Sequence, residues 1–483
     1  MGQASTDSPL PIRVVSRRLI KASDTSIEPY VRHFTNLEAT DNSQGYVACV
    51  YPSVSTGDFH AVAACFHTHL PSFLNFFFPW AGRIVPDAAT GRPELHCFNQ
   101  GAELLIGEIT DVALGSLDWA SSRRSLKKIL LPYADDVPLS LQVLSFACGG
   151  FSVVWGSNNL MGDGYTAMRT VMGWTELLRT GAVAGVQHRR SAVFRPRDPP
   201  AYGAEIAAAF RPCAHEHRVN ALTVADSTVE RLYYVEARDI AALCRAAATG
   251  GEGQRARVSR VHAFSAYTWK VLAGVVAASA LLPEEEKRCG LLLWVDARRR
   301  FSSPATLAAM RDYLGFGCAY VHEEAPAAAI LGKPLAEVAA ALREAIQRRD
   351  YDAVFQETVD LLEVHGRAGG GGSCYVEAPA VGLGSPTLAQ TMWSSFPTDL
   401  DFGFGQASLI MPVDSYAERL ASGLMLVGAR PGGDGSWIVS AEIWRCLAEA
   451  LEADQQRIFK PLTAEYLGFA ADAASKKKQI SRL

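Results

Sequence analysis

One strand-to-helix segment in the first half of the chain constrains the fold most. It begins with an apolar run rich in β-branched and aromatic residues, Leu141–Trp155, which predicts a buried strand with Gly149 and Gly150 inside it. The chain then turns through Gly156–Gly164, and apolar residues return at helical spacing over Tyr165–Leu178. A strand that leads through a short turn into an amphipathic helix is typical of folds in which helices cover a sheet. We therefore expect an α/β chain.

Strands and helices continue to alternate along the rest of the chain. An earlier helix, capped by Asp58, is predicted from apolar residues at helical spacing over Phe59–Phe73. Strands are predicted at Val229–Val235 and Leu291–Val295, with a helix at His262–Ala278 between them. Both halves of the chain therefore carry the same mixture of elements.

The length of the chain predicts two domains, because 483 residues exceed what one hydrophobic core usually organises. Periodic order is lost between residues 187 and 224, where prolines and charges gather as in a crossover between domains. We predict an N-terminal domain at residues 1–190, a crossover linker at 191–225 and a C-terminal domain at 226–483. The glycine-rich stretch Gly366–Ser373 is predicted to be a loop, and it lacks the Lys-Ser/Thr ending of a phosphate-binding loop.

Composition excludes several classes of protein. The chain is 49% hydrophobic and 20% charged, with a formal net charge of −4, so it lacks the basic excess expected of a nucleic-acid-binding protein. It contains no run of eighteen apolar residues, so we expect no transmembrane helix. Its 10 cysteines show no C-x-x-C spacing and are expected to be reduced, buried thiols that form neither disulfides nor zinc sites.

The two ends of the chain carry short address-like strings. Gly2 and Thr6 fit an N-terminal acylation pattern, although the segment lacks the features of a secretory signal. The C-terminal Ser481-Arg482-Leu483 is similar to the peroxisomal S-K-L address. We expect a cytoplasmic protein, with peroxisomal import through the C-terminal string as the alternative.

Two short strings carry the chemistry. The first, Asn159–Gly164, reads N-L-M-G-D-G and lies in the turn between strand and helix, where functional side chains concentrate. Asp163 is near the start of the following helix, where a carboxylate is a favourable cap, and this structural role is one interpretation of it. The second, Asp401–Gly405, reads D-F-G-F-G, in which alternating glycines and aromatic residues predict a tight, packed turn. Neither string alone identifies a function.

Together the two strings resemble the BAHD acyltransferases of plants, which carry H-x-x-x-D-G in the N-terminal domain and D-F-G-W-G late in the chain. Here Asn159 replaces the motif histidine and Phe404 replaces the tryptophan. The resemblance extends over almost the whole chain. Further segments similar to those of the family are Pro79–Arg83, Ser265–Lys270, Val295–Arg300 and Tyr313–Gly315.

The resemblance implies both a fold and a reaction. The implied fold has two similar mixed-sheet domains of the CoA-dependent, chloramphenicol acetyltransferase-like type, joined by a long crossover loop, with a channel between them. An acyl-CoA is the expected co-substrate, and a small molecule with a hydroxyl or amine group is the expected acceptor. No bound cofactor, metal or nucleic acid is implied, and members of the family usually act as monomers.

The resemblance also assigns roles to the motif residues. The motif histidine of the family takes the proton of the acceptor as it attacks the thioester carbonyl. The motif aspartate points away from the channel and pairs with an arginine, and by position Asp163 and Arg298 are that pair, with Asp163 as the anchor of the loop. The remaining motif residues are implied to be structural: Gly164, Asp401, Phe402, Gly403, Phe404 and Gly405.

Asn159 changes the chemistry that this chain can perform. Its carboxamide has no titratable proton near neutral pH, so it cannot act as a general base. Losing positioned acid–base catalysis typically costs about 10²–10⁴ in rate. The amide is still expected to donate a hydrogen bond to the substrate or to a developing oxyanion. The histidines available in principle match no family position for this role: His60, His67, His69, His262 and His365.

Three hypotheses follow. The chain is an acyl-CoA-dependent acyltransferase that acts on a small specialised metabolite through a degenerate motif. Alternatively, it is a pseudoenzyme that binds acyl-CoA or an acyl chain in lipid or acyl metabolism. In the third, it is a partner protein with a vestigial channel. The retained Asp163, Gly164 and D-F-G-F-G string favour the first two.

Overall fold

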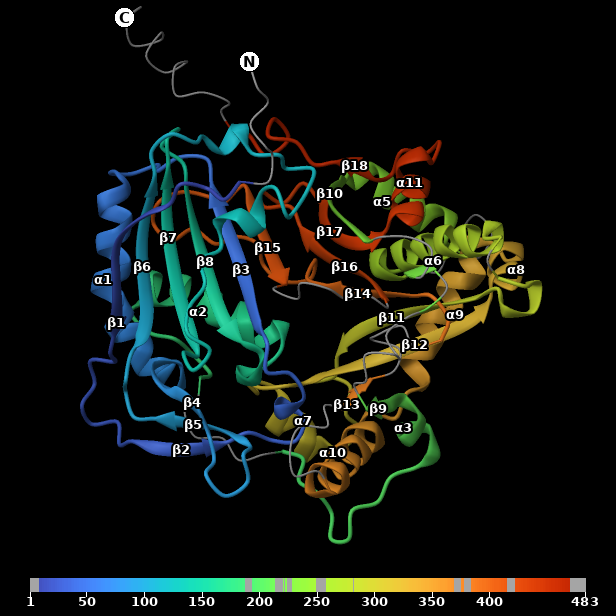
Figure 1. Cartoon of the computed structure of the whole chain (residues 1–483), viewed down its shortest axis with the longest axis horizontal. Coiled ribbons are helices and arrows are strands. Elements are labelled where there is room, and N and C mark those ends of the chain that lie inside the picture. The colour runs from blue at the N-terminus through green and yellow to red at the C-terminus, as the bar shows by residue number, and fades with distance from the viewer. Residues whose placement is uncertain are drawn as a thin grey trace, which may run out of the picture.

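Two large mixed sheets organise the protein, and they stand side by side in the computed structural model (Figure 1). The structure describes residues 8–186, 193–212, 220, 222–223, 228–248, 258–280, 282–368, 375–377, 384–414 and 422–469. The first sheet has six strands in the order β1 (Arg13–Ile20), β6 (Ala102–Ile109), β7 (Leu139–Phe146), β8 (Phe151–Asn158), β3 (Gln44–Tyr51) and β15 (Leu409–Asp414).

The second sheet has seven strands, drawn mainly in yellow to red in Figure 1. Their order is β12 (Cys318–Pro326), β11 (Arg288–Asp296), β14 (Thr387–Met392), β16 (Ser422–Ala429), β17 (Trp437–Trp444), β10 (Thr228–Val235) and β18 (Lys460–Pro461). Each large sheet mixes parallel and antiparallel pairs: β6 with β7 is parallel in the first, and β14 is parallel to both neighbours in the second.

Helices cover one face of each large sheet. In the first half these are α1 (Phe59–Phe76) and α2 (Gly164–Thr180). In the second half they are α5 (Ala237–Ala246), α6 (Arg260–Ala278), α8 (Ala327–Gly332), α9 (Leu335–Arg348) and α11 (Arg445–Ala453). The prediction that helices and strands alternate in both halves is confirmed.

Smaller elements surround the two sheets. A three-stranded sheet consists of β2 (Tyr30–His33), β5 (Pro93–Cys97) and β4 (Arg83–Pro86), and β9 (Phe210–Pro212) pairs with β13 (Tyr375–Glu377). The remaining α-helices are α3 (Ala204–Ala209), α7 (Pro304–Met310) and α10 (Tyr351–Ala368). Short 3-10 helices are η1 (Glu38–Thr40), η2 (Phe78–Ala81), η3 (Leu114–Ser116), η4 (Leu126–Ile129), η5 (Asn159–Met161) and η7 (Glu284–Glu286).

The packing of α1 and α2 explains why the first sheet holds the turn between strand and helix in place. Asp58 caps α1 by accepting a hydrogen bond from the backbone N–H of Ala61, as predicted. Phe66 of α1 stacks on Trp174 of α2 with ring centroids 4.6 Å apart, and Trp155 of β8 meets both rings edge-on. Buried aromatic pairs of this kind stabilise a core beyond the area that they bury.

The prediction of one strand over Leu141–Trp155 is wrong. The segment forms two antiparallel strands, β7 and β8, joined by a hairpin turn in which Phe146 donates to the carbonyl of Gly150. Gly149 has φ +80° in this turn, a conformation that glycine adopts without strain. Both strands are buried, so no polar residues mark the turn, and the two glycines were its signal.

Two predicted irregular stretches also contain regular structure. Within residues 187–224, the short helix α3 and strand β9 form, and β9 finds its partner β13 more than 160 positions away. Helix α10 continues through the first three residues of the predicted loop Gly366–Ser373, and residues 369–373 lie outside the described residues. A three-residue strand is not recognisable by its own pattern, because its partner alone makes it a strand.

Strand β15 connects the two halves of the chain. It pairs with β3 in the first sheet, with Leu409 opposite Val50, and it also contacts β16 of the second sheet. The first sheet therefore takes one strand from the range 226–483. The domain boundaries at 190 and 225 stay a prediction, and residues 187–192 and 224–227 lie outside the described residues.

Candidate functional site

The N-L-M-G-D-G string forms the turn from β8 into α2. Asn159–Met161 make the 3-10 helix η5, and Asn158 caps it by accepting a hydrogen bond of 2.8 Å from Leu160. Leu160 and Met161 are buried in the core under the first sheet. Because these two apolar side chains anchor the turn on its inner side, Asn159 is held at a fixed place between β8 and α2.

The Asn159 side chain contacts the segment that precedes β3. Its Nδ2 donates to Asp41 Oδ2 at 2.9 Å and to Ser43 Oγ at 3.0 Å. Its backbone N–H also donates to the Ser43 carbonyl at 2.8 Å. A carboxamide has only two hydrogens to donate. In this arrangement both hydrogens are engaged. The expectation that the Asn159 amide donates to substrate or an oxyanion therefore stays a prediction, and it requires one of these two hydrogen bonds to be exchanged.

Asp163 and Arg298 form a buried ion pair with two hydrogen bonds. Arg298 Nη1 donates to Asp163 Oδ2 at 2.8 Å, and Nη2 donates to Oδ1 at 3.0 Å. The side chains are only 5% and 1% exposed. Asp163 also caps α2 by accepting from Thr166 N–H, and it accepts a further bond from Gly317 N–H. The Asp163 carboxylate therefore has both predicted roles: it caps helix α2, and it pairs with Arg298.

The ionisation of this pair follows from its contacts. Burial by itself raises the pKa of the Asp163 carboxyl, but the Arg298 guanidinium and the hydrogen bonds outweigh it, and the pKa lies below its ordinary value. Burial by itself lowers the pKa of Arg298, and the Asp163 charge raises it overall. The pair is therefore fully charged at neutral pH, and Asp163 is not available as a base.

A second segment, residues 313–317 between α7 and β12, holds the Arg298 side chain from the other side. Arg298 donates to the carbonyls of Tyr313 and Gly315, at 3.0 and 2.8 Å. Thr166 Oγ1 exchanges hydrogen bonds with the backbone of Gly315 at 3.0 and 3.1 Å. A Cβ on Gly317 would lie 2.6 Å from Arg298 Cζ, so only glycine fits there. The similarity of Tyr313–Gly315 to a family segment was the signal for this role.

Sequence reasoning missed a buried glutamate next to the site. Glu38 of η1 is 1% exposed, and it accepts hydrogen bonds from Arg32 and from Tyr313 Oη, the latter at 3.2 Å. It therefore connects the N-terminal segment to the segment that holds Arg298. A single charged residue between Leu37 and Ala39 gives no pattern that predicts its own burial, so the sequence contained no usable signal.

The D-F-G-F-G string is a packed turn, as predicted. Asp401 Oδ1 accepts from Gly403 N–H at 2.8 Å and from Gly405 N–H at 3.0 Å, and both glycines have positive φ. Phe402 is fully buried and meets the rings of Tyr51, Phe66 and Trp155. Phe404 is 8% exposed in the same core. The string therefore stabilises the core of the first sheet and leads into β15.

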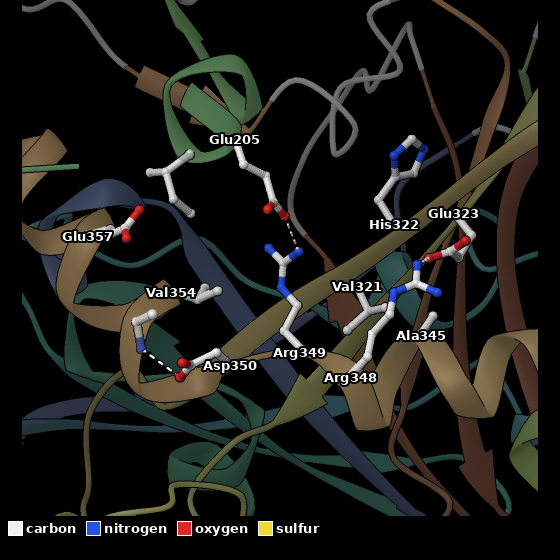
Figure 2. A pocket seen from close by; sticks show the side chains of 12 residues that line it. Glu205, Val321, His322, Glu323, Ala345, Arg348, Arg349, Asp350, Val354 and Glu357 are labelled. Carbon is white, nitrogen blue, oxygen red and sulfur yellow. Dashed lines mark hydrogen bonds and ion pairs between the residues drawn. The ribbon is translucent and has the colours of Figure 1, made fainter. Parts of the chain in front are cut away.

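The remaining titratable candidates do not approach Asn159. His60, His67 and His69 are exposed on α1, His262 lies near Arg300 and Arg343 at the start of α6, and His365 contacts Tyr202. A cavity of about 410 Å³ lies between β12, α3 and the α9–α10 junction (Figure 2), and it is lined by none of the motif residues. Figure 2 shows Arg349 beside Glu205 and Arg348 beside Glu323, so these two guanidinium groups are paired.

Gly162 is the conformationally critical residue of the turn. Its φ is +142°, and an added Cβ would lie 2.8 Å from Thr166 Cβ and 2.9 Å from the Gly315 carbonyl oxygen. Gly162→Ala is expected to lower the free energy of unfolding by about 3 kcal/mol, because backbone strain adds to the contacts. Chemical denaturation measures this.

Gly181→Ala is the matched control for that substitution. Gly181 also has a positive φ, +75°, but nothing lies within 4 Å of an added Cβ. Its substitution is expected to cost only the conformational part, about 1 kcal/mol. Equal losses for the two variants would contradict the role of the contacts to Thr166 and Gly315.

Comparisons with known proteins place this geometry in a family. The model of the Transferase family matches residues 11–441, so the chain belongs to this family, that of the BAHD acyltransferases. The chain is 26% identical over 396 residues to hydroxycinnamoyltransferase 1 of Oryza sativa subsp. japonica, covering 80% of this chain and 84% of the relative. It is 26% identical over 371 residues to agmatine hydroxycinnamoyltransferase 1 of the same organism, covering 74% and 78%.

Solved structures share the fold at low sequence identity. TRI101 of F. sporotrichioides, complexed with coenzyme A and T-2, matches with a TM-score of 0.69 at 15% identity, covering 89% of this chain and 99% of that chain. Vinorine synthase matches with a TM-score of 0.63 at 17% identity, covering 96% and 100%. The predicted fold class, two mixed-sheet halves of the CoA-dependent acyltransferase type, is confirmed. Of the helices that the structure describes, none is long and apolar enough to cross a membrane.

Proposed function

We propose that this protein transfers an acyl group from a CoA thioester to the amine or hydroxyl group of a small acceptor. Membership of an acyltransferase family supports the reaction class. The relatives named above, and a putrescine hydroxycinnamoyltransferase at 28% identity, support a hydroxycinnamoyl-type donor. The acyl-CoA is a co-substrate, and no bound cofactor or metal takes part in the proposal.

The observation that carries the proposal is the anchored turn around Asn159. The Asp163–Arg298 pair, the Thr166–Gly315 hydrogen bonds and the buried Leu160 are all in place. A buried ion pair is costly to maintain and is strongly destabilising when one partner is lost. Its presence supports a functional role for the shape of this turn, which carries Asn159 at the position that the resemblance assigns to the family's histidine.

The proposed acyl transfer does not depend on a strong general base for its whole rate. A thioester has a good leaving group, the CoA thiolate, and binding both substrates in one channel removes much of the entropic barrier. A neutral amine attacks without prior deprotonation, whereas a hydroxyl group needs a base to become a good nucleophile. Without a histidine at 159, amine acceptors are therefore expected to react faster than hydroxyl acceptors.

A second candidate function is acyl-CoA binding without turnover. The observation that favours it is that Asn159 has no titratable proton and has both amide hydrogens engaged by Asp41 and Ser43. In this case the fold and channel serve recognition, and the protein takes part in acyl or lipid metabolism as a binding partner.

Thiol release from a panel of acyl-CoAs distinguishes the two functions. Hydroxycinnamoyl-CoA and short-chain acyl-CoAs are offered with amine and hydroxyl acceptors, with reactions lacking acceptor as the control. The transferase is expected to release thiol above that control with at least one amine. Absence of release with every pair, together with CoA-thioester binding in calorimetry, would instead support the binding function.

The placement of the protein also belongs to the proposal. We infer a monomer of two domains, at 1–190 and 226–483, that works in the cytoplasm. Peroxisomal import through Ser481-Arg482-Leu483 is the alternative, and both this string and the Gly2–Thr6 pattern lie outside the described residues. A fluorescent fusion with a free C terminus separates the two compartments.

A further inference from the structure

The carboxylate of Asp41 lies against the residue that replaces the family's histidine. Asp41 sits between η1 and β3, partly buried, and Asn159 Nδ2 donates to its Oδ2 at 2.9 Å. We propose that Asp41 is a catalytic residue that accepts the proton of an amine acceptor during acyl transfer. This inference rests on the proposed function and deepens it by naming both the base and the acceptor class.

The hydrogen bonds that Asp41 accepts from described residues do not use all of its acceptor sites. Its Oδ1 accepts from Ser43 N–H at 3.0 Å and from Ser43 Oγ at 2.6 Å, whereas its Oδ2 accepts from Asn159 among the described residues. An ionised carboxyl group has about four acceptor sites. Three are used, so Oδ2 retains an acceptor site for a substrate N–H.

The contrast with Asp163 shows which of the two carboxylates is available for chemistry. Asp163 is paired with Arg298 and almost fully buried. Within the described parts of the chain, no ion pair joins Asp41 to a lysine, arginine or histidine, although its donors hold it in one orientation. An oriented carboxylate without a cationic partner is suited to an amine, which supplies positive charge as it attacks.

The position of Asp41 matches the role that histidine has in the family. Asp41 Oδ2 accepts a hydrogen bond from Asn159 Nδ2, so the carboxylate lies directly beside the side chain at the position that the resemblance assigns to the base. Gly45 supports the arrangement, because a Cβ there would lie 3.1 Å from Asn159 Oδ1. The carboxamide lies across this glycine and presents its nitrogen to Asp41.

The proposed step is balanced without a further reactant. The amine nitrogen forms a bond to the thioester carbonyl carbon, and the positively charged nitrogen of the tetrahedral intermediate gives one proton to Asp41 Oδ2. The C–S bond breaks, and the departing CoA thiolate takes the proton from Asp41. The products are an amide and CoA thiol, and the carboxylate is regenerated.

Steady-state kinetics on the full chain test the inference, with hydroxycinnamoyl-CoA and putrescine as probes. Asp41→Asn is expected to lower kcat about 100-fold. The dissociation constant of CoA thioester and the melting temperature are expected to remain within error. Ser43→Ala is the control, because it removes a donor to Asp41 and keeps the carboxylate, and a loss below tenfold is expected.

Chemical rescue separates a proton acceptor from a structural residue. Asp41→Gly is expected to recover at least tenfold in kcat when acetate is added, because acetate can occupy the vacated place and accept the proton. Asp41→Asn with unchanged kcat, or Asp41→Gly without any recovery, overturns the inference while leaving the proposed function intact. If the unsubstituted protein releases no thiol with any acceptor, the proposed function and this inference both fail.

Discussion

Arg298→Met is expected to lower the free energy of unfolding by about 3–5 kcal/mol. The substitution leaves the Asp163 carboxylate, 5% exposed, without its cationic partner. It also removes the hydrogen bonds to the Tyr313 and Gly315 carbonyls, so the 313–317 segment is released from the turn. Denaturant titration followed by tryptophan fluorescence measures the loss.

Two further variants make this result interpretable. Arg299→Met removes the exposed neighbouring guanidinium and is expected to change stability by less than about 0.5 kcal/mol. The double variant Asp163→Asn/Arg298→Met removes the buried charge as well, and it is expected to recover part of the loss. A loss below about 1 kcal/mol in Arg298→Met would contradict the importance of the buried pair.

The Asp163–Arg298 pair also predicts how the free energy of unfolding decreases in acid. The pKa of Asp163 is lower in the folded protein than in the unfolded chain, where it is about 3.9. Its contribution is therefore fully present above the unfolded pKa and is lost as the pH falls through the folded pKa. In Arg298→Met the guanidinium no longer offsets burial, so the pKa of Asp163 is expected to rise. A carboxyl group with a raised folded pKa destabilises the protein above that pKa, so the stability gap between the variant and the unsubstituted protein is expected to narrow as the pH falls.

Asn159→His is expected to raise the rate with hydroxyl acceptors about 100-fold or more. A histidine at 159 introduces a group that titrates near neutral pH at the position that the resemblance assigns to the family's base. The Asp41 carboxylate, which now accepts from Asn159 Nδ2, is placed to orient the ring and to stabilise its protonated form. Thiol release with a fixed acyl-CoA measures the gain.

The choice of acceptors and variants makes the Asn159→His result specific. With amine acceptors the gain is expected to be much smaller, because a neutral amine attacks without prior deprotonation and Asp41 is already proposed to accept its proton afterwards. Asn159→Ala, which adds no titratable group, is expected to show no gain with either acceptor. Equal gains with amine and hydroxyl acceptors would indicate that the histidine acts by altering binding, and the interpretation of residue 159 as the base position would then be wrong.

The sequence predicted the helices and strands whose patterns lie within a single short segment. Apolar periodicity located α1, α2 and α6, and Asp58 caps α1 as its chemistry predicts. The periodicity did not reveal the break between β7 and β8, because both strands are buried and neither has a polar face toward the turn. The prediction that residues 187–224 lack periodic order missed a strand, because β9 exists only through its pairing with β13.

The sequence by itself determined the family resemblance, the turn that carries Asn159 and Asp163, and the choice of Arg298 as the partner of Asp163. These conclusions were possible because short motifs with fixed spacing can be recognised without knowing the tertiary structure. Only the tertiary structure decided what surrounds Asn159, because Asp41 is 118 positions away and lies in a polar segment without periodicity. Burial of Glu38 and the hold of residues 313–317 on Arg298 were likewise decided by packing, since the partners meet only when distant segments of the chain fold together.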